Sequence, residues 1–82
     1  MEFPRIISVK AISASKLVAR FENGKLREYD CSPLFRLVEF FPLTTEAIFK
    51  AVKIDPGGRG LNWSDDIDLS ESEIWLNGTP ID

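Results

Sequence analysis

The sequence predicts a single small α+β domain over residues 1–82, with a mainly antiparallel sheet and short helices packed on one face of that sheet. Three observations predict this class. The chain has 82 residues, of which 44% are hydrophobic and 28% are charged, as in one globular domain with a modest core. An Asn-Gly dipeptide lies between two runs of alternating residues, and a complete helix-start pattern lies near the C-terminus.

An N-terminal strand and a first hairpin begin the predicted sheet. Residues 6–12 are rich in β-branched side chains and lack helical spacing, which favours a strand. Residues 17–21 and 25–29 flank Asn23-Gly24, a dipeptide that favours a type I′ turn because both central residues then take a positive φ. We therefore expect a hairpin with a two-residue loop.

The loop length decides which side chains share a face. With a two-residue loop Arg20 pairs with Arg27 and Val18 pairs with Tyr29, and paired residues lie on one face. The exposed face would carry Arg20, Lys25, Arg27 and Tyr29, and the buried face Leu17, Ala19, Phe21 and Leu26. Two arginines that face each other across a strand pair repel each other, unless solvent or a bound anion reduces the repulsion. This face is either a solvated sheet surface or a site for a partner's carboxylates, a small anionic ligand or nucleic acid.

Helical segments are expected after the hairpin. Ser32-Pro33 is typical of an N-cap followed by the first helical residue. Apolar residues then recur at steps of three and four, which predicts a helix that packs on the sheet and ends before Pro42. The residues in this pattern are Leu34, Leu37, Val38 and Phe41. Thr44 or Thr45 is expected to cap a further helical turn.

A second hairpin is predicted in the middle of the chain. Residues 51–55 and 60–63 have strand character, and the loop at 56–58 contains the proline and glycines that a reversal needs. These two strands complete the expected sheet of two hairpins and one N-terminal strand.

A final helix over residues 71–77 has signals at both ends. Ser70 and Glu73 have the spacing of a capping box, in which each side chain satisfies a backbone amide of the first turn. Leu69 and Ile74 occupy the positions of a hydrophobic staple, and the glycine at position 78 is typical of a helix end.

The residue types exclude most catalytic and metal chemistry. The chain has no histidine and one cysteine, Cys31, so Ser/His/Asp triads, Cys/His dyads and most transition-metal sites cannot form. A carboxylate beside Cys31 raises the pKa of a thiol, which predicts a packing role. We expect no catalytic, cofactor-binding or metal-binding residue, and therefore no enzyme. No apolar run is long enough to cross a bilayer and no signal peptide is evident, so a cytoplasmic location is expected.

Charge is distributed unevenly along the chain. Residues 1–41 carry seven basic and five acidic side chains, whereas residues 42–82 carry three basic and eight acidic ones. A net charge of −3 disfavours general nucleic-acid binding, and the acidic half suits a basic protein partner. We expect Asp65, Asp66 and Asp68 to contact that partner. The alternative, Mg²⁺ or Ca²⁺ binding, is disfavoured because the pattern lacks the glycine of a calcium loop and fits a turn.

The accumulated motifs resemble a known family. They are Phe21-x-Asn23-Gly24-x-x-Arg27-x-Tyr29-Asp30-x-x-Pro33-Leu34, then Gly60-x-x-Trp63 and Asp68-Leu69-Ser70. This string is similar to a family of small bacterial domains of unknown function, described as the antitoxin part of toxin–antitoxin systems and often encoded beside another short protein. The resemblance implies a small α+β domain, no catalytic residues, and a cognate protein from the adjacent gene that this chain neutralises. A homo-oligomer is also compatible with it.

Overall fold

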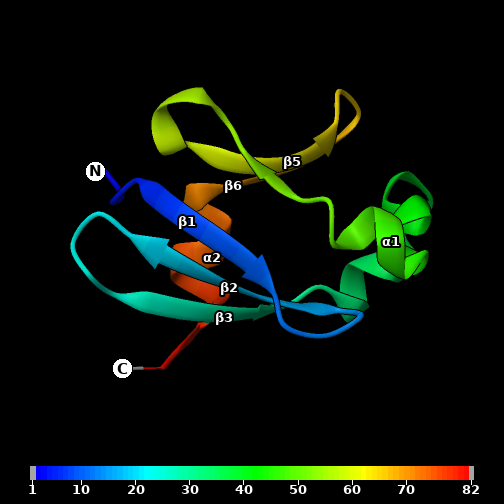
Figure 1. Cartoon of the computed structure of the whole chain (residues 1–82), viewed down its shortest axis with the longest axis horizontal. Helices are drawn as coiled ribbons and strands as arrows, with labels where there is room; N and C mark the ends of the chain where they lie inside the picture. The colour runs from blue at the N-terminus through cyan, green and yellow to red at the C-terminus, as the bar shows by residue number, and fades with distance from the viewer. Residues whose placement is uncertain (1, 82) are drawn as a thin grey trace.

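The computed structural model describes residues 2–81, and within them seven strands form two antiparallel sheets (Figure 1). The four-stranded sheet has the order β1-β2-β3-β7, with β1 at Ile6–Ala11, β2 at Lys16–Phe21, β3 at Leu26–Asp30 and β7 at Thr79–Pro80. The three-stranded sheet has the order β4-β5-β6, with β4 at Lys53–Ile54, β5 at Gly60–Ser64 and β6 at Ile67–Ser70.

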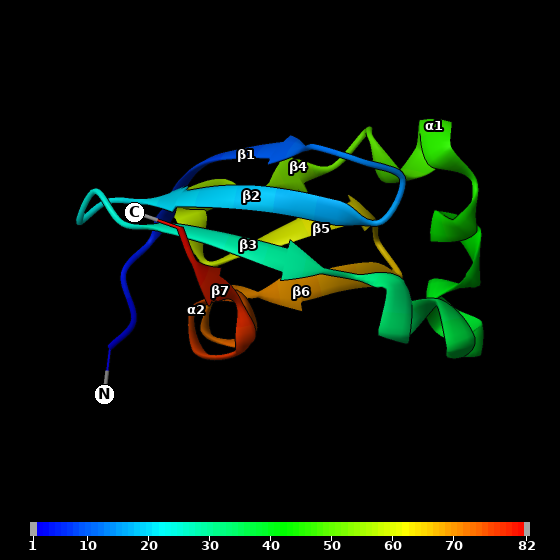
Figure 2. The same cartoon turned by 90° about the horizontal axis from the view of Figure 1, so that it is seen from below.

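Five short helical segments connect these strands. They are the 3-10 helices η1 (Ser32–Arg36), η2 (Val38–Thr44) and η3 (Pro56–Gly58) and the α-helices α1 (Glu46–Phe49) and α2 (Glu71–Asn77). The segments η1, η2 and α1 gather at one end of the molecule, and α2 lies below the sheets at the other end (Figure 2).

The core lies between the two sheets. Figure 2 shows the four-stranded sheet lying over the three-stranded one. The inward side chains of both sheets are buried together with residues from the helices, in a cluster of Ile6, Leu17, Ala19, Phe21, Tyr29, Cys31, Leu43, Phe49, Leu61, Ile67, Leu69 and Ile74. The α+β class and the antiparallel pairing are therefore confirmed. The expectation of one sheet with helices on one face is corrected, because the second sheet covers the first.

The first hairpin forms where expected, but with a different turn. The loop has three residues, since the amide of Phe21 donates to the carbonyl of Lys25 and the amide of Gly24 donates to the carbonyl of Phe21, each at 2.9 Å. Gly24 has a φ of 84°, and within the described residues only glycines have a positive φ. Asn23 therefore does not adopt the positive φ that a type I′ turn requires. A turn closed by one left-handed glycine is the geometry that gives a three-residue hairpin loop.

The longer loop shifts the register of β3 by one residue. Ala19 pairs with Arg27 and Leu17 pairs with Tyr29, instead of Arg20 with Arg27 and Val18 with Tyr29. Because side chains alternate along a strand, this shift moves every side chain of β3 to the opposite face from the one predicted.

The helix expected after Ser32 is broken in two. Leu37 has an extended backbone, with φ −86° and ψ 137°, and it separates η1 from η2. Pro42 lies inside η2 instead of after it, and Cys31 instead of Ser32 occupies the N-cap position. A 3-10 helix has three residues per turn, so the predicted α-helical face does not form.

The second hairpin and the final helix are confirmed. β4 pairs with β5 around η3, and α2 runs over residues 71–77 with Ser70 as its N-cap. The hydroxyl of Ser70 accepts from the amide of Glu73 at 3.2 Å, but the Glu73 side chain bonds elsewhere. The strands β6 and β7 were not anticipated. Within residues 2–81 no helix is long and apolar enough to span a bilayer.

Candidate functional site

The shifted register separates the four residues that the sequence placed on one hairpin face. Arg20 lies on the outer face of the four-stranded sheet, and Lys25 is exposed next to the turn. Arg27 and Tyr29 lie on the opposite face, toward α2. The predicted cluster of these four residues is therefore corrected, and with it the idea that Arg27 faces Arg20.

Tyr29 is a buried link between β3 and α2. Only 6% of its surface is exposed, and its hydroxyl donates to a carboxylate oxygen of Glu73 at 2.7 Å. Burial raises the pKa of Tyr29 well above its usual range, and the hydrogen bond and the negative charge of Glu73 raise it further. Tyr29 is thus a neutral hydrogen-bond donor inside the fold. The prediction that its side chain lies on the exposed face is wrong.

Arg27 is likewise engaged inside the fold. Its guanidinium lies 3.9 Å from the centre of the Trp75 ring, its Nε donates to the carbonyl of Trp75 at 3.4 Å, and an Nη donates to the carbonyl of Leu26 at 3.0 Å. Gly78 lets the chain pass close to this side chain, because a Cβ at position 78 would meet the Cβ of Arg27 at 3.0 Å. Arg27 therefore attaches α2 and the segment after it to β3.

A hollow of about 360 Å³ lies between β3 and α2 beside these contacts. Its carboxylates already have partners within the chain. Glu73 accepts from Tyr29, Asp30 accepts from the amide of Ser32 at 2.9 Å, and Glu28 lies 4.0 Å from the ammonium of Lys16. The amide of Ser32 is the main reason that the pKa of Asp30 lies below its usual range. The polar groups around this hollow therefore serve to hold the fold together.

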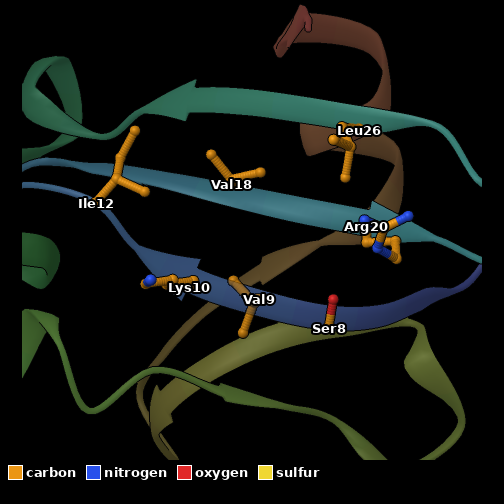
Figure 3. Close-up of a pocket in the computed structure, with 7 residues that line it drawn as sticks. All are labelled: Ser8, Val9, Lys10, Ile12, Val18, Arg20 and Leu26. Atoms are coloured by element: carbon orange, nitrogen blue, oxygen red, sulfur yellow. The ribbon is translucent and has the colours of Figure 1, made fainter. Parts of the chain in front are cut away.

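A second hollow, of about 480 Å³, opens on the outer face of the four-stranded sheet (Figure 3). We call it the sheet-face hollow. It is lined by Ser8, Val9, Lys10, Ile12, Val18, Arg20 and Leu26, which come from the β1 strand, the loop after it, β2 and β3. The pairing of Lys10 with Val18 and of Ser8 with Arg20 sets these side chains on one face. Four of these residues are aliphatic, and three of them, Ile12, Val18 and Leu26, form an apolar floor.

Two cations flank this floor. Lys10 and Arg20 are both exposed, and neither forms an ion pair with any residue that the structure describes. The nearby Lys16 and Glu28 offset each other's charge. The sheet-face hollow thus combines an apolar floor with an excess of positive charge, a combination suited to acidic groups on an otherwise apolar partner.

A different exposed apolar surface lies at the end of the molecule formed by η1, η2 and α1. Val38 is 84% exposed and Phe41 64% exposed, and Leu37 and Ile48 are also exposed. These are the residues that the sequence pattern placed against the sheet, together with one from α1. Large exposed apolar side chains at one end of a small domain make this end a candidate contact surface.

The acidic residues predicted to bind a partner are divided between two places. Asp65 and Asp66 form the exposed turn between β5 and β6, and Asp68 lies on the outward side of β6, paired with Asn62. The turn lies at the same end of the molecule as η1, η2 and α1 (Figures 1 and 2). The indole of Trp63 fixes this proximity, because its Nε1 donates to the carbonyl of Phe49 at 2.8 Å.

We call the surface made of Leu37, Val38, Phe41, Ile48, Asp65 and Asp66 the acidic end. The other charges at this end add up to zero. Glu46 forms an ion pair with Lys50 at 2.6 Å, and the positive charge of Arg36 is equal in size to the negative charge of Glu39. The excess negative charge comes from Asp65 and Asp66. In residues 2–81 no group of carboxylates is arranged to hold a metal ion.

Cys31 has the packing role that the sequence predicts. Its side chain is fully buried in the core. Burial, with a smaller effect from Asp30, raises the pKa of the thiol to about 12. Cys31 is therefore protonated at neutral pH and is not a nucleophile.

Sequence reasoning missed most residues of both surfaces. Lys10 and Ile12 were not singled out because the first predicted strand was assigned no face, whereas Leu26 was placed on the buried face because the hairpin register was wrong. One signal was available: placing the large ring of Tyr29 on the apolar face with Leu17 favours the longer loop. For Val38 and Phe41 the misleading signal was the α-helical spacing itself.

Comparison with known proteins gives one match. A family model described as "Protein of unknown function (DUF2442)" matches residues 6–80, which is most of the chain. Neither the comparison with curated proteins nor the comparison with solved structures finds a match.

Proposed function

This chain belongs to the DUF2442 family of proteins of unknown function, and we propose that it is a non-catalytic interaction module that binds a basic cognate protein through its acidic end. The single observation that carries this proposal is that η2, with the largely exposed Val38 and Phe41, lies at the same end of the molecule as the acidic turn between β5 and β6. The apolar side chains supply contact area, and the carboxylates favour a positively charged partner.

The biological role proposed for this module is that of an antitoxin. The sequence motifs resemble domains described in that role, and the cognate protein would be the product of the adjacent gene. An antitoxin acts by covering a working surface of its toxin, which requires an exposed apolar contact region and no chemistry of its own. The inert, protonated Cys31 agrees with a non-catalytic role.

The alternative role as an anion-binding or nucleic-acid-binding domain loses its original site. Arg27 and Tyr29 are engaged with α2, so only Arg20 and Lys25 of the four residues remain on exposed surface. Two cations on a chain with a net charge of −3 are a weak electrostatic site for a polyanion. The protein-interaction role is therefore preferred.

The proposal is tested by co-expressing this chain with the product of the adjacent gene. Affinity purification of the complex measures binding, and growth of cells that express the neighbouring product alone measures toxicity. We expect a stable complex and restored growth. A complex without toxicity would retain the interaction module and reject the antitoxin role, whereas the absence of a complex would reject both.

Paired variants locate the binding surface. Val38→Ser with Phe41→Ser should weaken the complex by about tenfold or more, because exposed apolar anchors carry most binding energy. Ile7→Ser is the matched control, since Ile7 is 56% exposed and lies outside the acidic end. Asp66→Lys should slow association, whereas Glu2→Lys, which changes the net charge equally, should not. Equal effects of each variant and its control would reject the acidic end as the site.

A further inference from the structure

The sheet-face hollow is not used by the proposed binding of the cognate protein. Its floor of Ile12, Val18 and Leu26 lies on the outer face of the four-stranded sheet, and all of the residues that line it come from β1, the loop after it, β2 and β3 (Figure 3). Lys10 and Arg20 stand on this face without an ion-pair partner in the described chain. A ligand for this surface therefore needs an apolar patch and at least one carboxylate beside it.

The acidic end of the same protein has this chemistry. Val38 and Phe41 are its most exposed apolar side chains, and the exposed Asp65 and Asp66 supply carboxylates from the turn between β5 and β6. The hollow has an excess of positive charge where the acidic end has an excess of negative charge. A second copy of the chain thus carries a surface that complements the hollow in both polarity and charge.

The two surfaces lie on different sides of the molecule. The hollow is on the outer face of the four-stranded sheet, whereas η1, η2 and α1 project from one end of the sheets (Figure 2). A contact between two different surfaces is heterologous, and an open assembly built from it keeps one unused hollow at one end and one unused acidic end at the other. Such a contact produces rings or open chains instead of a two-fold symmetric dimer.

We propose that this protein self-associates head to tail, with the acidic end of one copy seated in the sheet-face hollow of the next. Lys10 and Arg20 of one copy meet Asp65 and Asp66 of its neighbour, and Val38 and Phe41 lie on the aliphatic floor. Because the basic cognate protein would bind the same acidic end, its binding would dissociate the assembly. This last consequence rests on the proposed function, whereas self-association does not.

Sedimentation velocity of the purified chain tests the proposal across micromolar to millimolar concentrations. We expect the average mass to rise with concentration and to fall when salt is added, since the contact includes opposite charges. A chain that stays monomeric over the whole range overturns the proposal. The measurement uses no partner, so its failure is separate from failure of the proposed function.

Two variants, each with only one of the two surfaces altered, test the heterologous geometry. The hollow variant carries Lys10→Glu and Arg20→Glu, and the end variant carries Asp65→Lys and Asp66→Lys. Each should be monomeric alone, because each lacks one half of the contact. An equal mixture should associate again, because the end of each variant complements the charge of the other variant's hollow. A mixture that stays monomeric overturns the proposal, as does either variant that associates alone like the parent chain.

Two controls complete this experiment. A chain with all four substitutions exchanges the charges of both surfaces and should associate again, whereas Glu2→Lys should associate like the parent chain. Circular dichroism confirms that each variant folds, and the substituted side chains are all exposed. If a charge variant does not fold, Val18→Ser for the hollow and Val38→Ser for the end replace the pair. Each should associate less than the parent chain alone, and their equal mixture should form 1:1 dimers through the one contact in which both halves are intact.

Discussion

The hydroxyl of Tyr29 donates a 2.7 Å hydrogen bond to the carboxylate of Glu73, and this bond joins the C-terminal end of β3 to the first turn of α2. Ser70 still caps α2 by accepting from the amide of Glu73. The Glu73 side chain thus makes a tertiary contact in place of its expected part in the capping box. Together with the stack of Arg27 on Trp75, this bond holds α2 against the four-stranded sheet.

The Tyr29–Glu73 bond should contribute measurably to stability. Tyr29→Phe removes the donor and is expected to lower the free energy of unfolding by about 1 kcal/mol, the usual net value of a hydrogen bond. Urea unfolding at neutral pH measures this loss. In a Glu73→Ala background the same Tyr29→Phe change should cost clearly less, and an equal cost in both backgrounds would show that the bond contributes nothing.

Stability should decline at alkaline pH because two buried groups hold their protons. The folded-state pKa of Cys31, about 12, and that of Tyr29 both lie above the unfolded values of about 8.5 and 10. The folded chain therefore retains protons that the unfolded chain releases. The resulting stabilisation is complete below the unfolded pKa and is lost as pH rises toward the folded pKa.

Cys31→Ala tests this linkage. Urea unfolding from about pH 8 to about pH 11 should show a steep fall in stability for the parent chain and a shallower one for Cys31→Ala. The comparison concerns the slopes, because the substitution also changes packing. Parallel curves would contradict the assignment. A thiol reagent should label Cys31 in urea far faster than in the native protein, since the native thiol is buried and protonated.

The left-handed conformation of Gly24 should determine the cost of substitutions in the first hairpin. A Cβ at this position would meet no atom within 4 Å, so backbone strain at φ 84° is the only penalty. Gly24→Ala is expected to cost about 1 kcal/mol. Gly24→Asn should cost less, because asparagine tolerates this region better. Thermal unfolding measures both, and an alanine variant as stable as the parent would contradict this turn.

The stack of Arg27 on Trp75 should distinguish arginine from lysine at this position. Arg27→Lys keeps the charge but loses the planar contact and the Nε hydrogen bond, with an expected loss of about 1 kcal/mol. Arg20→Lys is the matched control on the exposed face and should change stability by less than about 0.5 kcal/mol. Similar losses for both variants would mean that the stack is not stabilising.

Several elements could be predicted from the sequence because their signals are local. The capping pattern at Ser70 and Glu73 places α2 correctly, and the proline and glycines after Asp55 place the second hairpin. The Asn23-Gly24 dipeptide correctly indicates a reversal, because a glycine is needed there in either turn type. The number of loop residues is a finer property, and the dipeptide does not specify it.

Non-local elements were missed for a physical reason. β7 consists of Thr79 and Pro80, and it is a strand only because Arg27 and Glu28 lie beside it. β6 follows an acidic turn whose composition suggests a loop, but Ile67 and Leu69 alternate inward against the first sheet. Their strand character depends on partners far away in the sequence, which no local pattern describes.

The sequence by itself determined the α+β class, the positions of both hairpins and α2, the absence of histidine chemistry and the excess of acid in the C-terminal half. Tertiary structure decided which side chains reach solvent. A one-residue change in loop length turned Arg27 and Tyr29 toward α2 and left Lys10 and Arg20 beside an apolar floor. The extended backbone at Leu37 broke a helical pattern and exposed Val38 and Phe41. Register and the packing of distant segments decide which face a side chain occupies, whereas the hairpin turns and α2 are specified by their own residues.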